Sequence, residues 1–214
     1  GMDQIALVEA KMPKIIEEIK QTPANEKIIL FTKYVTGMVD VMAEELERNN
    51  ISYTFFTGSR KEGLDEGLGA EFFNGSRVLI ASSAVAEGID KIQDHCNNVW
   101  FVGHGWTSTE RQQVIGRVYR TGQKKPVSIV NFVAKINDYD YDQRVKIDRI
   151  DTKQMYHDMI VNGEYPDDYI KGKKEKWSTI VDELIAGGKV SGQRVVDTGT
   201  IRVLKKKQKR LKKK

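Results

Sequence analysis

Short, nearly all-apolar runs that alternate with amphipathic stretches constrain the fold of this 214-residue chain more than any other feature. A strand that is buried on both faces of a parallel sheet has this continuous apolar character. The predicted strands are residues 27–31, 51–56, 78–81, 99–102 and 127–132. Helical spacing of apolar residues predicts helices at 35–48 and 62–73. We therefore predict an α/β fold, a doubly wound parallel sheet with helices on both faces.

Further helices are predicted at both ends of the chain. Residues 3–20 carry an apolar stripe at helical spacing, but Pro13 lies inside it. We expect this proline to kink or split the helix, which would then begin properly near Pro13. Residues 138–161 and 177–185 also have helical patterns, and residues 191–204 are predicted to form a short hairpin. A mainly helical C-terminal extension is therefore expected beyond the sheet.

The stretch QVIGRVYRTGQ, residues 113–123, lies in a further predicted helix. Thr107 followed by Glu110 has the spacing of a capping box, which predicts a helix that starts near Thr107. Gly122 follows Thr121, and glycine is the usual residue just past a helix C-terminus. The helix is therefore expected to run to about Thr121.

Two arginines and a glycine in this helix indicate a site for a polyphosphate. Arg117 and Arg120 are three residues apart, so both guanidinium groups would project from one helix face. Gly116 is unfavourable inside a helix by about 1 kcal/mol relative to alanine. We expect another backbone or a ligand to come close to it. The alternative for the two arginines alone is a solvated cationic helix face.

A second polar stretch, SSAVAEGID (residues 82–90), follows the predicted strand 78–81. Ligands of doubly wound sheets bind at the carboxyl ends of the strands. Ser82 and Ser83 carry small hydroxyls that can donate to a phosphate, and Gly88 permits a turn. Asp90 can accept from a ribose hydroxyl or orient an arginine. The alternative is an ordinary polar turn between a strand and a helix.

These stretches resemble conserved motifs of superfamily-two helicases. Residues 113–120 match the pattern Q-x-x-G-R-x-x-R, and residues 82–90 are similar to T-x-x-x-x-x-G-I-D, with Ser82 in place of Thr. Trp106 and the ending Gly122-Gln123 resemble the Swi/Snf-type branch, although Thr107 and Ser108 replace the Asn and Pro of its W-N-P segment.

The resemblance covers roughly residues 10–150 and implies a domain organisation. Residues 1–155 are expected to form the C-terminal RecA-like lobe of an ATP-dependent DNA helicase or translocase. Residues 156–204 would be an accessory extension and residues 205–214 a basic tail. Gly1 ahead of Met2 indicates an expressed fragment.

The resemblance also implies roles in ATP hydrolysis. In the family, ATP lies between two RecA-like lobes, and the first lobe holds the phosphate loop and Mg²⁺. This sequence has no G-x-x-x-x-G-K-[ST], so the first lobe is an expected partner and this fragment alone is expected to be inactive. Arg120 is the expected arginine finger, Arg117 a second γ-phosphate contact, and Gln113 a positioning residue. The residues expected to bind the nucleotide are Gly88, Asp90, Gly116, Arg117 and Arg120.

Nucleic acid is the second implied partner, DNA rather than RNA because of Trp106 and the Gly-Gln ending. The loop after residues 27–31 resembles motif four, and the loop after residues 51–56 matches a glycine-bearing loop of the family. The expected nucleic-acid contacts are Lys33, Gly58, Arg60, Ser82 and Ser83. An RNA helicase lobe and a catalytically inert nucleic-acid-binding scaffold are the alternatives.

The charge of the chain is unevenly distributed. Residues 205–214 carry eight positive charges, more than the net charge of +5, so residues 1–204 carry −3. The basic tail predicts either an arm for phosphate backbones or a solubility or localisation segment. Cys96 and three histidines lack zinc-ligand spacing, so no metal site is expected in the chain. The sequence shows neither a signal peptide nor an apolar run that could span a membrane, and we expect an intracellular protein.

Overall fold

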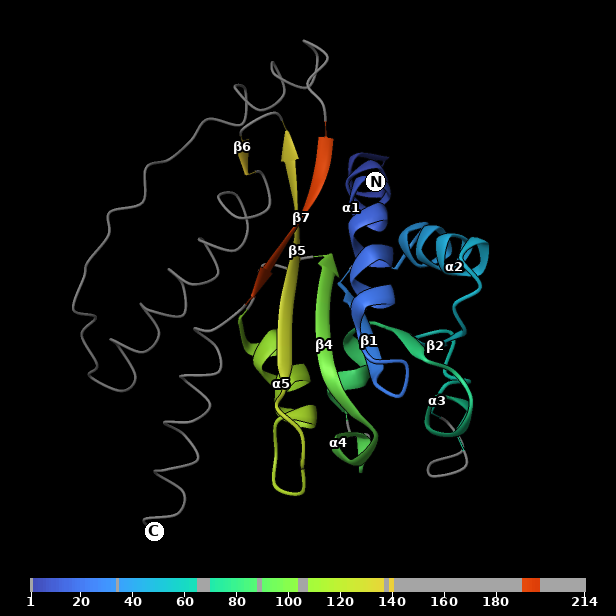
Figure 1. Ribbon diagram of the computed structural model, residues 1–214, viewed down its shortest axis with the longest axis vertical. Helices are drawn as coiled ribbons and strands as arrows, with labels where there is room; N and C mark the ends of the chain where they lie inside the picture. Colours follow the sequence, from blue (N-terminus) through green and yellow to red (C-terminus); the bar gives the residue numbers. More distant parts are fainter. Residues whose placement is uncertain are drawn as a thin grey trace, which may run out of the picture.

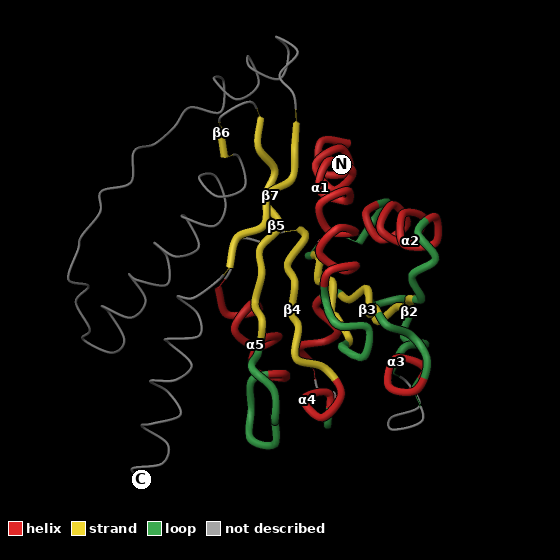
Figure 2. Tube along the Cα trace, in the orientation of Figure 1, coloured by secondary structure: helices red, strands yellow, loops and turns green. Residues whose placement is uncertain are grey.

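The computed structural model of the chain describes residues 2–33, 35–64, 70–87, 90–103, 108–136, 139–140 and 190–196. Five parallel strands form the main part of one sheet (Figures 1 and 2). In spatial order they are β2 (Tyr53–Phe56), β3 (Val78–Ala81), β1 (Lys27–Thr32), β4 (Cys96–Gly103) and β5 (Ser128–Ile136). Each predicted strand is present, which confirms the parallel sheet, although β2 begins two residues later than predicted and β4 and β5 extend beyond the predicted residues.

Side chains alternate between the two faces of the sheet, and each face is covered by helices. One core includes Ile28, Leu30 and Val102 and packs against α1 (Met2–Gln21) and α2 (Met38–Arg48). The other core includes Ile29 and Phe101. Its remaining cover comes from α3 (Glu71–Asn74), the 3₁₀ helix η2 (Ser83–Glu87), α4 (Ile92–His95) and α5 (Ser108–Val118). This two-sided burial confirms the doubly wound architecture.

The first helix differs from the prediction because Pro13 neither splits it nor marks its start. Helix α1 runs from Met2 to Gln21 with Pro13 inside. Pro13 removes the hydrogen bond to the carbonyl of Glu9. Both residues lie on the exposed side of the helix, where water can satisfy that carbonyl. The buried stripe that includes Met12 and Ile15 holds the helix on the sheet.

The predicted helix at residues 62–73 is wrong at its beginning. Residues 62–64 form a turn, and the described helical residues are those of α3, Glu71–Asn74. The amide of Gly63 donates to the carbonyl of Phe55 over 2.9 Å, so the chain lies against β2 there. A Cβ on Gly63 would lie 2.8 Å from that carbonyl oxygen, which only glycine avoids. Contact with the strand therefore takes the place of the predicted helix at residues 62–64.

Two antiparallel strands extend the sheet beyond β5. The short β6 (Tyr139–Asp140) pairs with the end of β5, and β7 (Val190–Val196) pairs with β5 from Val130 to Ile136. The helix predicted from Asp138 is therefore wrong at residues 139–140, because they join the sheet. The rest of that helix, the helix at 177–185 and the hairpin partner in 197–204 lie outside the described residues.

Strand β7 lies beside α1 as well as β5. The Arg194 guanidinium Nε lies 3.0 Å from the carboxylate of Glu18 on α1. A segment that begins fifty residues after the end of β6 thus becomes part of the same sheet (Figure 1). Within the described ranges, no helix combines the length and the apolar character needed to cross a bilayer.

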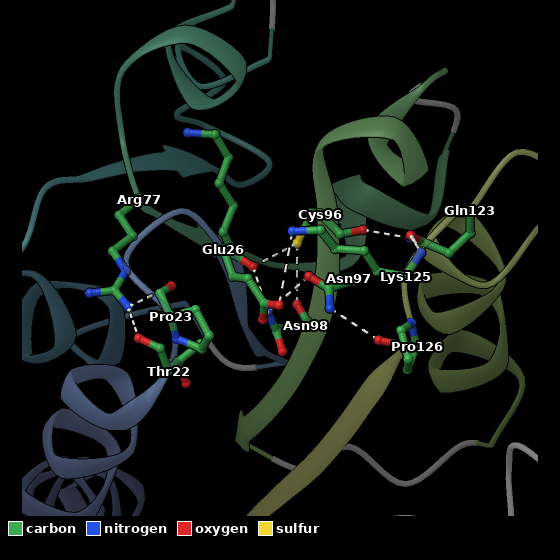
Figure 3. A network of polar contacts seen from close by, with 11 residues as sticks. Thr22, Pro23, Glu26, Arg77, Cys96, Asn97, Asn98, Gln123, Lys125 and Pro126 are labelled. Atoms are coloured by element: carbon green, nitrogen blue, oxygen red, sulfur yellow. Dashed lines mark hydrogen bonds and ion pairs between the residues drawn. The ribbon is translucent and has the colours of Figure 1, made fainter.

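A polar network fastens the amino ends of β1 and β4 (Figure 3). The side-chain amide of Asn98 donates to the carboxylate of Glu26 over 3.2 Å, and that of Asn97 donates to the carbonyl of Pro126 over 3.0 Å. Nearby, the Arg77 guanidinium donates to the carbonyls of Ile19 and Thr22 at the end of α1. Both carbonyls lie at the C-terminal end of α1, where main-chain oxygens lack the amide partners that a continuing helix would supply.

Candidate functional site

The exits of four parallel strands lie in a row along one edge of the sheet. Phe56 of β2 and Phe31 of β1 are both register partners of Ala81 on β3, and Phe31 pairs with Phe101 on β4. Neighbouring strands are about 4.8 Å apart. The loops that begin at Thr57, Ser82 and Lys33 therefore follow one another at short intervals, as the sheet rule predicted.

Lys33 joins three segments of this edge. Its ammonium group donates to the hydroxyl of Ser83 over 3.2 Å and to the carboxylate of Glu110 over 2.9 Å. Lys33 follows β1, Ser83 begins η2 after β3, and Glu110 lies in the first turn of α5. The Lys33 side chain is 41% exposed and that of Glu110 is 15% exposed. The ion pair therefore links the row of strand exits to the beginning of α5.

The other predicted residues after β3 differ in their accessibility. Ser82 is 4% exposed, its amide donates to the carbonyl of Phe56 over 3.1 Å, and its carbonyl accepts from Val85. Ser83 is partly exposed. Ser83 is therefore better placed than Ser82 to meet a ligand. Gly88 lies outside the described residues.

In the loop after β2, the Arg60 side chain lies against residues of β2 and α2. The Arg60 guanidinium lies 3.3 Å from the centre of the Phe55 ring, and it is 3.4 Å from Glu62 and 3.8 Å from Asp40. Two carboxylates thus lie near this exposed cation. A Cβ built on the exposed Gly58 meets no atom within 4 Å, so the loop backbone is open at that point.

Helix α5 begins at Ser108, next to the predicted start at Thr107, which is outside the described residues. Val114, Ile115 and Val118 are fully buried against the sheet. The Arg111 guanidinium lies 4.0 Å from the centre of the Phe101 ring on β4. These contacts fix the rotation of the helix about its axis, so its remaining face points away from the sheet.

The outward side of α5 carries the predicted motif residues. Gln113 is exposed, and Gly116 and Arg117 are partly exposed. A Cβ built on Gly116 would meet no atom within 4 Å apart from its own helix. Within the described chain nothing approaches Gly116, so the expected close neighbour does not come from these segments.

Helix α5 ends earlier than predicted, and this changes the position of Arg120. The last helical residue is Val118, so Arg120 lies in the following turn and does not share a helix face with Arg117. The Gln123 side-chain amide donates to the carbonyl of Val118 over 3.3 Å, which caps the end of the helix. Gly122 has a φ of 102°, a left-handed conformation that favours glycine.

Asp90 and Arg120 meet in space although the sequence separates them. A carboxylate oxygen of Asp90 lies 4.0 Å from Nη1 of Arg120. The side chains are 88% and 42% exposed, respectively. The prediction that Asp90 could orient an arginine has a geometric counterpart here. Both groups remain accessible to a ligand or to another domain.

The thiol of Cys96 is free and buried. Burial raises the pKa of its thiol from 9.0 to about 12, because the thiolate would lose its hydration. The thiol donates to the carbonyl of Lys27 over 3.2 Å. Among the residues that the structure describes, no group of three or more His, Cys, Asp or Glu side chains could hold a metal ion.

Sequence reasoning missed one contact of α5 and one contact of the segment that follows it. Glu110 was interpreted only as a capping-box residue, yet its carboxylate pairs with Lys33, 77 residues away. Gln123 was interpreted only as a branch signature, yet its amide donates to the carbonyl of Cys96 over 2.9 Å (Figure 3). No local pattern links such distant residues, because the strand order brings them together.

Comparisons with known proteins agree with this arrangement. Residues 10–122 match the family model described as the helicase conserved C-terminal domain. The chain is 27% identical over 128 residues to DNA repair protein RAD5 of Yarrowia lipolytica, covering 59% of the chain and 12% of that protein. It is 31% identical over 126 residues to the uncharacterized ATP-dependent helicase YqhH of Bacillus subtilis, covering 59% of the chain and 22% of that protein.

A solved structure also shares the fold. It is the C-terminal part of the Fun30 ATPase domain, with a TM-score of 0.53 and 18% sequence identity. The match covers 80% of this chain and 50% of that structure. The chain thus spans less than a quarter of the two curated relatives described above, and half of the matched Fun30 chain.

Proposed function

Because the chain belongs to the helicase conserved C-terminal domain family, as the C-terminal RecA-like lobe of a superfamily-two helicase, we propose that it is one half of an ATP-dependent DNA translocase or helicase. Its partner would be an N-terminal RecA-like lobe of the same protein. DNA is the proposed track because several similar proteins are named DNA repair proteins. The similarity to RAD5 and rad8 proteins agrees with the resemblance to the Swi/Snf-type branch.

The observation that carries this proposal is the open outward side of α5 and the turn after it. Gly116 leaves space for a close neighbour, and Arg117 and Arg120 lie along the same segment. Arg120 is exposed beside Asp90, so a phosphate can reach its guanidinium without unfolding the lobe. A surface of this kind suits one wall of a cleft that is completed by another domain.

Arg120 is proposed as the arginine finger, and Arg117 as a second contact to the γ-phosphate. ATP, with Mg²⁺ held by the first lobe, supplies the bond that is cleaved. A guanidinium aimed at the transferring phosphoryl group stabilises its developing negative charge, an effect worth about 10³–10⁵ in rate in related nucleotide hydrolases. Asp90 orients Arg120 before the lobes close, and Gln113 positions groups at the same wall.

The row of strand exits is proposed as the path of the nucleic-acid backbone. Lys33 and Ser83 provide an ammonium group and a hydroxyl within 3.2 Å of each other. Gly58 exposes backbone in the neighbouring loop. Such groups contact phosphates without reading the base sequence, which suits a motor that moves along DNA. Arg60 would contribute its charge only in part, because Asp40 and Glu62 lie beside it.

The experiment that tests the proposal is steady-state ATP hydrolysis by a two-lobed protein that contains this chain. We expect turnover that rises with single-stranded or duplex DNA more than with RNA, and none from the 214-residue chain alone. Stronger stimulation by RNA would favour the RNA helicase reading. An absence of turnover in the two-lobed protein, with DNA binding retained, would favour the inert scaffold.

A further inference from the structure

Lys33 is a cation of the proposed DNA path, and its charge is neutralised by an ion pair with Glu110. Lys33 lies among the strand exits, and its ammonium group is 2.9 Å from the carboxylate of Glu110. At this distance the two opposite charges largely cancel, so a third charged group is attracted only weakly by the pair. A DNA phosphate that approaches Lys33 therefore meets a cation that is already compensated, and a carboxylate that repels it.

Glu110 also has an alternative source of stabilisation. It lies in the first turn of α5, where the helix dipole favours a negative charge. If Lys33 moves away, the helix dipole still stabilises the Glu110 carboxylate. The loss of the ion pair therefore costs less than it would for a buried charge without other partners. Lys33 is the more exposed partner and has a long flexible side chain, so Lys33 is the group that moves.

Helix α5 connects this exposed ion pair to the proposed catalytic arginine. Glu110 and Arg117 are seven residues apart on the helix, a separation of about 10 Å along its axis. The far end is fixed because Gln123 binds the carbonyls of Val118 and Cys96. The breakable contact thus lies at the end near the strand exits.

We propose that Glu110 competes with a DNA phosphate for Lys33, so that DNA binding breaks the Lys33–Glu110 pair and releases the first turn of α5. This inference rests on the proposed function. Glu110 is a positioning residue, because its pair with Lys33 keeps α5 in its DNA-free position. DNA binding is weaker as a result, since this ion pair must be broken before Lys33 can bind a phosphate. DNA can shift α5 only if its contacts differ between the DNA-free and the DNA-bound state. The difference is the partner of Lys33, which is Glu110 without DNA and a phosphate with DNA.

Removal of the Glu110 charge tests the competition. Fluorescence anisotropy with a short labelled DNA duplex, and with its single strand, measures binding by the 214-residue chain and by a version that ends at residue 204. Glu110→Gln is expected to tighten binding about three- to tenfold, the range of a modest charge pair. Lys33→Ala should weaken binding and reduce the salt slope by about one. In the Lys33→Ala background only the direct repulsion between the Glu110 carboxylate and the phosphate remains, so Glu110→Gln should tighten binding much less.

Glu44→Gln is the matched control, because it removes the same charge from an exposed pair with Arg48 on α2. It should leave the affinity unchanged. If Glu110→Gln leaves the affinity unchanged or weaker, or tightens it equally without Lys33, the inference is overturned and the proposed function stands. A chain ending at residue 204 that binds neither DNA overturns the proposed nucleic-acid path as well.

A second measurement tests the coupling to α5. In the two-lobed protein, Glu110→Gln is expected to raise ATP turnover without DNA and to lower the ratio of DNA-stimulated to basal turnover. A merely structural role for Glu110 would reduce both rates together. An unchanged ratio in Glu110→Gln would overturn the coupling.

Discussion

The side-chain amide of Gln123 donates to the main-chain carbonyl of Cys96 over 2.9 Å, so the segment that follows α5 is fastened to the first residue of β4 (Figure 3). The same side chain caps Val118 and accepts from the amide of Lys125. One glutamine thus ends the helix, shapes the turn that carries Arg120 and joins both to the sheet.

Gln123→Ala should lower the free energy of unfolding of the chain by about 1–3 kcal/mol, because the carbonyls of Cys96 and Val118 lose a donor. Urea denaturation followed by circular dichroism measures this change. Lys124→Ala, a change at an exposed residue of the same turn, is the control and should have little effect. Equal stability of the Gln123 and Lys124 variants would show that the amide is not an anchor.

Gly116 and Gly103 should respond in opposite ways to alanine. Gly116→Ala should stabilise the isolated chain by up to about 1 kcal/mol, since alanine is the better helix former and space is open. Gly103→Ala should destabilise it by about 1–3 kcal/mol, because its Cβ would overlap the buried Thr32 side chain. Thermal and urea unfolding of the two variants provide the measurement.

The same Gly116 variant also tests the proposed cleft. In the two-lobed protein, Gly116→Ala should lower ATP turnover at least severalfold, since the added methyl group would fill space meant for the first lobe or the nucleotide. A more stable chain with unchanged turnover in the two-lobed protein would mean that nothing approaches Gly116.

Arg120→Ala in the two-lobed protein should reduce DNA-stimulated ATP turnover by several orders of magnitude and leave DNA affinity near normal. Arg120→Lys should not restore turnover, because a flexible point charge lacks the planar fork of the guanidinium. Arg117→Ala should also be severe, and the double variant little worse than either. Steady-state kinetics with parallel binding measurements decide this, and turnover like that of the wild type in Arg120→Ala would refute the finger.

Cys96 should resist alkylation in the folded chain at pH 8 and react fully after denaturation, because its thiol is buried and its pKa is raised to about 12. The unfolded thiol ionises first as the pH rises above its ordinary value. Stability should therefore fall between about pH 9 and pH 12, by at most about 1.4 kcal/mol per pH unit from this group. Cys96→Ala should remove this part of the pH dependence, and rapid labelling of the native chain would contradict the burial.

Removal of residues 205–214 should weaken DNA binding and flatten the dependence of log K on log salt, because fewer counterions are released. The loss should be similar for unrelated DNA sequences. Titrations of the full and shortened chains at several salt concentrations measure both quantities. An unchanged affinity and slope would assign the tail to solubility or localisation.

Local sequence patterns were sufficient for the five parallel strands and for the approximate position of the motifs. Apolar runs such as residues 27–31 and 78–81 have one stable environment, a strand covered on both sides, and the structure confirms it. The start of α5 was also predictable, since caps and apolar spacing are local properties. The parallel-sheet rule correctly placed the polar loops at one edge.

Other features depended on contacts between distant residues, which local propensity does not encode. Pro13 was predicted to split α1, but burial of Met12 and Ile15 on the opposite side keeps the helix continuous. Helix α5 ends at Val118 and not at the predicted Thr121, because the Gln123 side chain caps it at Val118.

The pairings of the candidate site were decided in the same way. Neither the Lys33–Glu110 pair nor the Asp90–Arg120 pair has a local sequence signal. Strand order brings the members of each pair together, and strand order follows from the packing of whole layers. The sequence by itself determined which residues we expect to bind phosphate, and only the tertiary structure decided which of them meet, because charges interact through space and not along the chain.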